Sequence, residues 1–504
     1  MVGTSHESEN YDRFTAKRIN FDQQENMSLQ LGSAQDQNAW SEGNQWTINS
    51  FFSRVNYTFA NKYVIEGTIR ADGSSRFDPD HRWGWFPGVN AAWRVGEEGF
   101  MKRLGWFEDL KVRASYGEMG NQSGIGLYDY IQLISLSNDY YPFGTGVKGQ
   151  MATSGNIIST SRTWETIQTT NVGFDFSTLN NRLYGSFDYF WKENKNMLIP
   201  KTYPSMLGAD APSTNSGHLS IHGWEISLGW RDQIKDFSYS VRFNISDAKN
   251  KVVDRVGSNL IKLGNNETPT GYPLNSYFGY EFDGIIQNEQ ELEAYKSRFS
   301  EGGIPGDLSV GDAMYKDLDG DGKLSVLGDG KEGSGDVKYL GDKNPRYNFG
   351  FNLSMAWKGF DLSAFIQGVG RRTMFLEGES RCPMPEAWYQ SAEYWYGKTW
   401  TPERTDAQYP AITLKDKRNY NYYVSTNTKF NVAYARLKNL QFGYTIPQTL
   451  TSKAGLQKVR VYFSGEDLFE VHNTPNGWDP EENSGSITSY PFTRNYSFGI
   501  NVVF

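Results

Sequence analysis

The chain has 504 residues, one cysteine, and a formal net charge of −8 from 50 basic and 58 acidic residues. This balance provides no basic surface for nucleic acid, so we expect no nucleic-acid partner, and a single cysteine excludes an intrachain disulfide. Only 38% of residues are hydrophobic, but 15 Trp, 31 Tyr and 31 Phe supply much of that share beside 52 Gly, which favours strands and turns over helices.

The N-terminal stretch MVGTSHESENYDR has no apolar core and does not look like a signal peptide. The sequence also has no run of 18 apolar residues, so we expect no helix that spans a membrane. Two interpretations follow. Either the protein is soluble in the cytoplasm, or the chain is a piece of a longer protein whose export signal lies upstream.

Apolar and polar residues alternate along much of the chain, which predicts strands with one dry face and one wet face. In NFGFNLSMAW, for example, the apolar set is Phe349, Phe351, Leu353, Met355 and Trp357. About thirteen such segments of roughly 8–13 residues are predicted, the length that crosses a bilayer. They begin near residues 51, 63, 85, 110, 168, 183, 222, 237, 346, 360, 432, 459 and 492, and a fourteenth short strand is expected at the N-terminus.

The connections between these segments alternate between short and long. Short ones cover 59–62, 177–182, 231–236 and 357–360, whereas long ones cover about 119–165, 249–345 and 369–431. The apolar faces end in aromatic residues, and the opposite faces carry charges in mid-strand. These features are typical of an antiparallel transmembrane β-barrel, an all-β fold with short periplasmic turns and long outer loops. A soluble β-sandwich or propeller is the alternative.

Several segments resemble a known protein family and occur in the same order along the chain as in that family. They are SFFSRVNYTFANKYVIEGTIRADGSSRF (50–77), RWGWFPGVNAAWRVGEEGFMK (82–102), YFGYEFDGIIQNEQEL (277–292), GDAMYKDLDGDGKL (311–324), KGFDLSAFIQGVG (358–370) and WTPERTDAQYP (400–410). Together they resemble the SusC/RagA family of TonB-linked outer-membrane transporters. In the last segment, Arg404 and Thr405 stand where that family usually has Asn and Pro.

The resemblance implies a 22-stranded barrel around a plug domain. This sequence matches the C-terminal 13 or 14 strands and contains no plug, so we interpret it as the C-terminal portion of a transporter, either a gene fragment or half of a split protein. Residues 1–49 are expected to form a remnant strand and an extracellular loop, and residues 50–504 the C-terminal part of the barrel. The expected location is the outer membrane of a Bacteroidetes-type Gram-negative cell.

The resemblance also implies partners. These are a SusD-like surface lipoprotein, the TonB–ExbB–ExbD complex reached through the missing N-terminal part, and oligosaccharide or peptide cargo. The sequence has no catalytic motif of a known hydrolase, so we predict a transport protein and not an enzyme. A calcium-binding extracellular β-rich glycan-binding protein or enzyme remains an alternative, as does a passive porin or adhesin.

The segment DLDGDGKLSVLGD (317–329) has the spacing of a calcium loop. Asp317, Asp319 and Asp321 would supply side-chain oxygens, and Lys323 would supply its carbonyl. The twelfth position is Gly328 instead of the usual Glu, and Asp329 follows. The sequence therefore predicts a Ca²⁺ ion in this loop as its one cofactor, with a hydrated acidic turn as the alternative.

The last strand, NYSFGINVVF, ends on an aromatic residue with no polar tail after it. In outer-membrane barrels such a strand resembles the signal that the barrel assembly machinery recognises. We therefore predict that its alternate apolar residues form the assembly signal and meet outer-membrane lipid. These residues are Tyr496, Phe498, Ile500, Val502 and Phe504.

Overall fold

The structure is a computed structural model of residues 1–504. It describes all of them except residues 22–27, 34, 36, 138–141, 144–146, 149–150, 156, 201–205, 207–211, 256–263, 268, 328–334, 387–389, 414–416, 483–484, 486–489 and 491. Among the described helices, none has the length and apolar character needed to cross a membrane.

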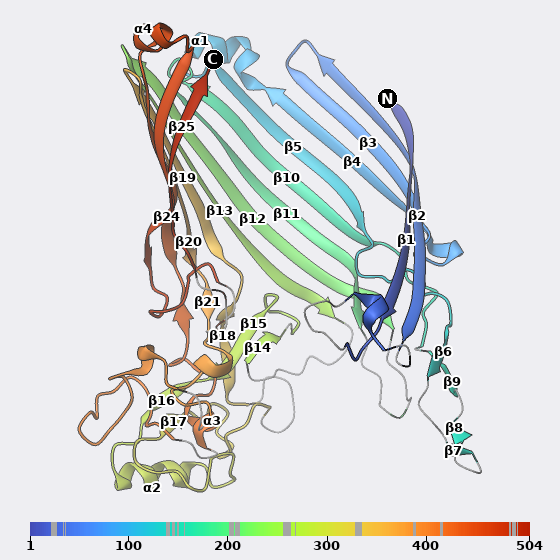
Figure 1. Ribbon diagram of the computed structural model, residues 1–504, viewed down its shortest axis with the longest axis vertical. Helices are drawn as coiled ribbons and strands as arrows, with labels where there is room; N and C mark the ends of the chain where they lie inside the picture. The colour runs from blue at the N-terminus through green and yellow to red at the C-terminus, as the bar shows by residue number, and fades with distance from the viewer. Residues whose placement is uncertain are drawn as a thin grey trace.

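Within the described chain, fourteen strands form one antiparallel sheet, in which each strand pairs with the next large strand in sequence (Figure 1). The predicted all-β antiparallel fold is confirmed. Across the sheet the strands are β1 (Val2–Lys17), β2 (Asn38–Phe59), β3 (Tyr63–Ser74), β4 (Trp83–Arg94), β5 (Asp109–Asn121), β10 (Glu165–Thr178), β11 (Leu183–Pro200), β12 (Ser213–Ile234), β13 (Phe237–Arg255), β19 (Arg346–Trp357), β20 (Phe360–Arg371), β23 (Tyr434–Thr445), β24 (Lys458–His472) and β25 (Asn495–Val503).

Shorter elements occupy the connections. The small strands are β6 (Ile134–Ser137), β7 (Pro142–Phe143), β8 (Val147–Lys148), β9 (Met151–Ser154), β14 (Gly264–Glu267), β15 (Ser276–Tyr280), β16 (Phe282–Ile285), β17 (Ala313–Tyr315), β18 (Val337–Asp342), β21 (Thr373–Met374) and β22 (Phe430–Asn431). The α-helices are α1 (Gly99–Leu104), α2 (Glu289–Arg298), α3 (Lys417–Asn421) and α4 (Gln448–Thr451). Short 3-10 helices cover Leu29–Leu31, Pro79–His81, Val95–Glu97, Gly378–Ser380, Glu393–Trp395 and Ser452–Ala454.

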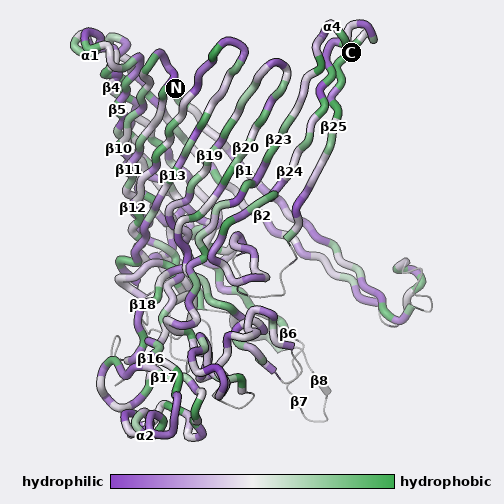
Figure 2. Tube along the Cα trace, turned by 90° about the vertical axis from the view of Figure 1, so that its left-hand side faces the viewer, coloured by the Kyte–Doolittle hydropathy of each residue, from purple (hydrophilic) through white to green (hydrophobic). Residues whose placement is uncertain are grey.

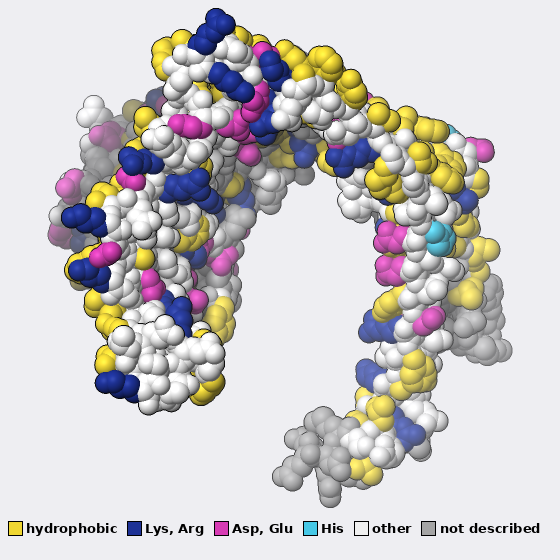
Figure 3. All heavy atoms as spheres, turned by 90° about the horizontal axis from the view of Figure 1, so that it is seen from above, with side chains coloured by type: hydrophobic (Ala, Val, Ile, Leu, Met, Phe, Trp, Pro, Cys, Tyr) yellow, Lys and Arg dark blue, Asp and Glu magenta, His cyan; other side chains and the backbone are white. Residues whose placement is uncertain are grey.

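The sheet curves into an arch that stays open (Figure 3). Among the described residues, β1 pairs only with β2, and β25 pairs only with β24. Most strands begin within three residues of the predicted positions, but β2 and β12 each extend over 22 residues, beyond the expected length. The parts of these strands beyond the apolar segment continue because backbone hydrogen bonds between strands form without an apolar face. The β1–β2 ladder is an example, since it runs from Val2 opposite Ser53 to Lys17 opposite Asn38. The expected boundary between residues 49 and 50 remains a prediction, and β2 runs through it without a break.

Short turns and long loops separate to opposite ends of the sheet, as predicted (Figure 1). The turn between β19 and β20 consists of Lys358 and Gly359, with φ angles of 46° and 88°. Two successive positive φ angles define the tight hairpin turn whose twist matches that of its strands. Both chain termini lie at this same end, the C-terminus beside α4 and the N-terminus on the other side of the arch (Figures 1 and 2).

The two faces of the sheet differ in polarity, and hydrophobic and hydrophilic positions alternate along the strands (Figure 2). Phe351 of β19 stands opposite Phe243 of β13 on one side and Ile366 of β20 on the other. In the right-hand part of the arch in Figure 3, charged side chains lie on the inner side and hydrophobic side chains follow the outer side. We call these the concave and convex faces.

At the end of the long loops, the described residues of 264–345 and 372–433 build a loop subdomain with a packed core, to which Trp478 of the β24–β25 connection also contributes. Its core is rich in tyrosine, which can bury a ring and still satisfy its hydroxyl. The hydroxyls of Tyr295 and Tyr420 lie 2.7 Å apart, and the Tyr295 hydroxyl also accepts a hydrogen bond from the main-chain nitrogen of Tyr315 at 2.9 Å. This core fixes the position of the acidic loop that follows Tyr315.

Candidate functional site

The concave face carries ion pairs in mid-strand. Arg113 of β5 donates to both carboxylate oxygens of Asp175 on β10, at 2.8 and 3.0 Å, and to both oxygens of Asp188 on β11, each at 3.0 Å. Lys111 adds an ion pair to Asp175 at 2.7 Å. A charge on a lipid-facing strand position costs about 2–4 kcal/mol at mid-bilayer for Arg or Lys. Four charged groups across three neighbouring strands therefore indicate that this face meets water.

The convex face has the opposite character. Large apolar side chains stand exposed along it, among them Phe51, Val55, Tyr57 and Phe59 of β2 and Trp85 of β4. Neighbouring strands pair these rings, as in the stacked Tyr63 and Trp93 with centroids 6.4 Å apart. An apolar surface that continues over many strands is far larger than a soluble monomer exposes. It matches the apolar band with aromatic girdles that faces lipid in a membrane barrel.

All five residues of the predicted assembly signal lie on or directly after the edge strand β25 and are exposed. Phe498, with 84% of its surface accessible, packs its ring 5.3 Å from that of Phe463 on β24. Phe504 follows the last residue of the strand. The structure thus places these apolar side chains in one row on the convex face, and their role in assembly remains a prediction.

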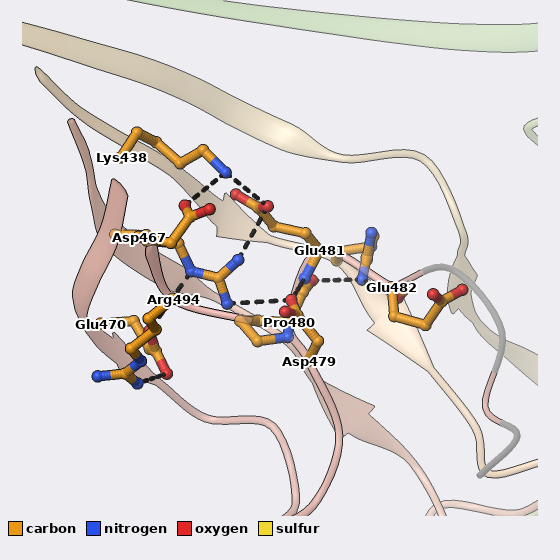
Figure 4. Close-up of polar contacts among 10 residues, drawn as sticks. Lys438, Asp467, Glu470, Asp479, Pro480, Glu481, Glu482 and Arg494 are labelled. Atoms are coloured by element: carbon orange, nitrogen blue, oxygen red, sulfur yellow. Dashed lines mark hydrogen bonds and ion pairs between the residues drawn. The ribbon is translucent and has the colours of Figure 1, made fainter. Parts of the chain in front are cut away.

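A charged cluster, which we call the Arg436 cluster, ties the connection between β24 and β25 to the sheet. Arg436 on β23 is only 1% exposed and forms ion pairs with Glu481 at 2.9 Å, Asp479 at 3.0 Å and Glu470 at 3.5 Å. Lys438 contacts Glu481 at 3.0 Å. Figure 4 shows these acidic side chains converging from β24 and from the segment 479–482.

Two further cations complete this arrangement. The Arg372 guanidinium donates to the main-chain carbonyls of Pro480 and Glu482, at 2.7 and 2.9 Å. Arg494, just before β25, pairs with Glu470 at 2.7 Å. Glu470 lies on β24, and Pro480 lies in the connection between β24 and β25. These bonds therefore hold the described part of that connection against β24 and against Arg372 directly after β20. No local pattern in the sequence predicts this cluster, because its members lie up to 110 residues apart.

The acidic loop is held by hydrogen bonds from its own backbone. Asp317 accepts from the main-chain nitrogens of Gly320 at 2.6 Å and Gly322 at 3.0 Å. Both glycines have positive φ angles, 75° and 76°, which residues with a side chain rarely adopt. Asp321 accepts from the main-chain nitrogen of Lys323 at 2.8 Å. The tight loop predicted from the Asp-Gly spacing is therefore present.

Three carboxylates converge in this loop, and one of them was not predicted. Oxygens of Asp317, Asp319 and Asp336 lie within 4.8 Å of one another. Asp336 is 0% exposed and accepts from the main-chain nitrogens of Leu318 at 2.7 Å and Ser325 at 2.8 Å. Asp321 does not belong to this converging set, and Asp329 lies outside the described residues.

The electrostatics of the three carboxylates suit a cation. Burial raises the pKa of Asp336, and the nearby Asp319 and Asp317 raise it further. Burial also raises the pKa of Asp319, with added repulsion from Asp321 and Asp317. In both carboxylates, burial and repulsion from like charges outweigh the main-chain hydrogen bonds that favour the ionised form. Three converging hard oxygens with this repulsion fit a divalent cation, which would need further oxygens to reach the six to eight that Ca²⁺ takes.

Comparison with known proteins places these features in context. A family model described as "TonB dependent receptor-like, beta-barrel" matches residues 2–468. The chain is 32% identical over 490 residues to TonB-dependent receptor P3 of Formosa agariphila, covering 92% of this chain and 46% of that protein. It is 27% identical over 497 residues to TonB-dependent receptor SusC of Bacteroides thetaiotaomicron, covering 93% and 45%.

Among solved structures, the fold is similar to that of the RagAB peptide transporter, with a TM-score of 0.78 at 22% identity. That match covers 99% of this chain and 52% of the other. The chain thus spans about half the length of the relatives it matches.

Proposed function

This chain belongs to the TonB-dependent receptor family of outer-membrane β-barrels, and we propose that it forms the C-terminal barrel part of an importer similar to SusC and RagA. The chain crosses the outer membrane with its strands. One observation supports the proposal above all: the sheet has a continuous apolar convex face and a charged concave face. Two such surfaces suit a barrel wall that has lipid on its convex side and a water-filled lumen on its concave side. Solutes would cross such a lumen without chemical change.

The partners belong to this proposal. A SusD-like lipoprotein would close the loop side of the barrel, and the TonB–ExbB–ExbD complex would supply energy through a plug outside this sequence. The cargo would be an oligosaccharide or a peptide, in line with a relative named SusC and a structural neighbour named a peptide transporter. The free edges of β1 and β25 would pair with further strands, because an open edge cannot face lipid.

Uptake by whole cells tests the transport proposal. Cells with and without the gene receive fluorescent oligosaccharides and, separately, fluorescent peptides, in the presence and absence of a protonophore. We expect uptake of one class to depend on both the gene and the proton gradient. Uptake that survives the protonophore would indicate a passive pore, and a protein extracted without detergent would indicate a soluble binding protein or enzyme.

We also propose that the acidic loop binds Ca²⁺, with Asp336 as a ligand beside the predicted Asp317 and Asp319. The support is the convergence of the three carboxylates and the raised pKa of Asp319 and Asp336. When bound, Ca²⁺ would neutralise this repulsion and tighten the loop against the subdomain core.

Calcium binding is measured by equilibrium dialysis of the detergent-solubilised protein with radioactive calcium. We expect saturable binding that Asp336→Asn weakens by about tenfold or more, since it removes a buried charged ligand. Asp321→Asn is the matched comparison, because Asp321 lies outside the converging set, and its loss should be smaller. Absence of saturable binding, or equal binding by the Asp336 variant, would refute the proposal.

A further inference from the structure

A pocket lies where the loop ends of β13, β19 and β20 meet the loop subdomain. We call it the rim pocket, and its cavity volume is about 240 Å³. Four of its described lining residues are cationic and one is acidic: Lys249, Arg346, Arg371, Arg372 and Asp342. The cavity is far larger than the roughly 10–15 Å³ that holds one water molecule, so it has room for a hydrated polar group.

The cations of the rim pocket are unequally neutralised. Arg346 forms a two-pronged ion pair with Asp247, so its charge is balanced. Arg371 stands directly opposite Arg346 across the β19–β20 ladder, and both Arg371 and Lys249 are exposed. In the part of the chain that the structure describes, the side chains of Arg371 and Lys249 form no hydrogen bond or ion pair with another residue.

Neutral partners take up the other polar groups of the pocket. Arg372 donates to two main-chain carbonyls, which bring no negative charge. The carboxylate of Asp342 accepts from the Tyr339 hydroxyl at 2.7 Å and from the Asn344 amide at 2.8 Å. Asp247 balances Arg346, and the carboxylates of Asp479 and Glu482 act on Arg372, so the positive charge left in the pocket rests on Arg371 and Lys249.

The pKa of the nearby Lys429 reflects the same excess of positive charge. Burial lowers the pKa of Lys429, and repulsion by Arg371 and Lys338 lowers it further. Cations that face one another across a ladder destabilise the sheet locally. An anion placed between them would remove this repulsion and gain charge-assisted hydrogen bonds, and the guanidinium of Arg371 has the planar geometry that binds a carboxylate or sulfate in a two-pronged manner.

We propose that the rim pocket is a binding site for an oxyanion, a carboxylate or sulfate group carried by a solute that passes along the loop side of the barrel. Arg371 and Lys249 would contact the anion directly, and Arg372 would add its field from the buried side. The inference deepens the proposed function, on which it rests, because it assigns an acidic substituent to the cargo.

Equilibrium dialysis with radioactive sulfate tests this site in the detergent-solubilised protein at low ionic strength. We expect saturable sulfate binding, competition by acetate, and a loss of affinity of about tenfold or more when Arg371→Gln and Lys249→Gln are combined. Among the described residues, neither side chain has a hydrogen bond or ion pair to lose, so the double variant should remain folded. Arg103→Gln is the control, since it removes an exposed cation from α1 at the opposite end of the sheet.

Several results would overturn the inference. They are absence of saturable sulfate binding, unchanged affinity in the Arg371 and Lys249 double variant, or an equal loss in the Arg103 variant. If a phosphorus-containing lipid copurified with the protein and blocked sulfate binding, the bound anion would be a lipid headgroup. That result would contradict the proposal that the anion belongs to a solute. The dialysis assay measures binding and does not depend on transport. Its result can therefore be interpreted even if the uptake experiment shows no transport.

Discussion

The Leu353→Arg variant should lower the free energy of unfolding in lipid vesicles by about 2–4 kcal/mol, the cost of a cationic side chain at the lipid-facing midplane of a barrel. Leu353 lies on the convex face near the middle of β19, opposite Val241 and Ala364. A guanidinium at this point would be transferred from water to hydrocarbon, and neither of these two cross-strand neighbours is acidic.

The next residue provides the matched control. Ser354 lies on the concave face, opposite Ser240 and Ser363, where an arginine can stay in water. Ser354→Arg should therefore change the free energy of unfolding by no more than about 0.5 kcal/mol, as for an ordinary surface substitution. Urea titration of the intact protein in vesicles measures both values. Equal costs for the two variants would contradict the assignment of the faces.

The Arg436→Met variant should destabilise the connection between β24 and β25 by about 3–5 kcal/mol, the usual cost of removing one member of a buried charged group. The change leaves Glu470, Asp479 and Glu481 close together with their shared buried cation gone. Their repulsion should release the segment 479–482 from the sheet.

Hydrogen exchange of the segment before β25 measures this local opening. A loss of 3 kcal/mol corresponds to an exchange rate roughly 150-fold faster. Arg494→Met is the comparison, because Arg494 is 41% exposed at its side chain, where it forms an ion pair with Glu470 and a hydrogen bond to the main-chain carbonyl of Leu468. Such an exposed pair is worth about 1 kcal/mol or less. If both variants exchanged at the same rate, the Arg436 cluster would not be the group that holds the connection.

The strands could be predicted from sequence because alternation with a period of two is a local signal. A residue such as Phe351 shows its face through its neighbours at 349 and 353, whatever the rest of the chain does. The order of short and long connections then fixed which end each loop occupies. Alternation does not distinguish a sandwich core from a lipid face, and the exposed rings on the convex face resolve that point.

The candidate sites depend on contacts that no local pattern records. Asp336 joins Asp317 because two main-chain nitrogens, of Leu318 and Ser325, hold its carboxylate inside the loop. Arg436 meets Asp479 across 43 residues. In the rim pocket, Lys249 and Arg371 come together only when β13, β19 and β20 are aligned. Spacing rules relate residues a few positions apart, whereas the members of these groups come from segments that are more distant along the chain.

Spin-label accessibility along β19 tests the central claim most directly, namely that the sheet separates lipid from water. Cys382, which is buried, is first replaced by alanine, and single cysteines are then placed at successive positions from 350 to 356 in the protein as it stands in the outer membrane. Labels at Phe351, Leu353 and Met355 should collide with dissolved oxygen, whereas labels at Asn352 and Ser354 should collide with a water-soluble nickel complex. Nickel access at every position, or a pattern without the period of two, would contradict a membrane barrel wall.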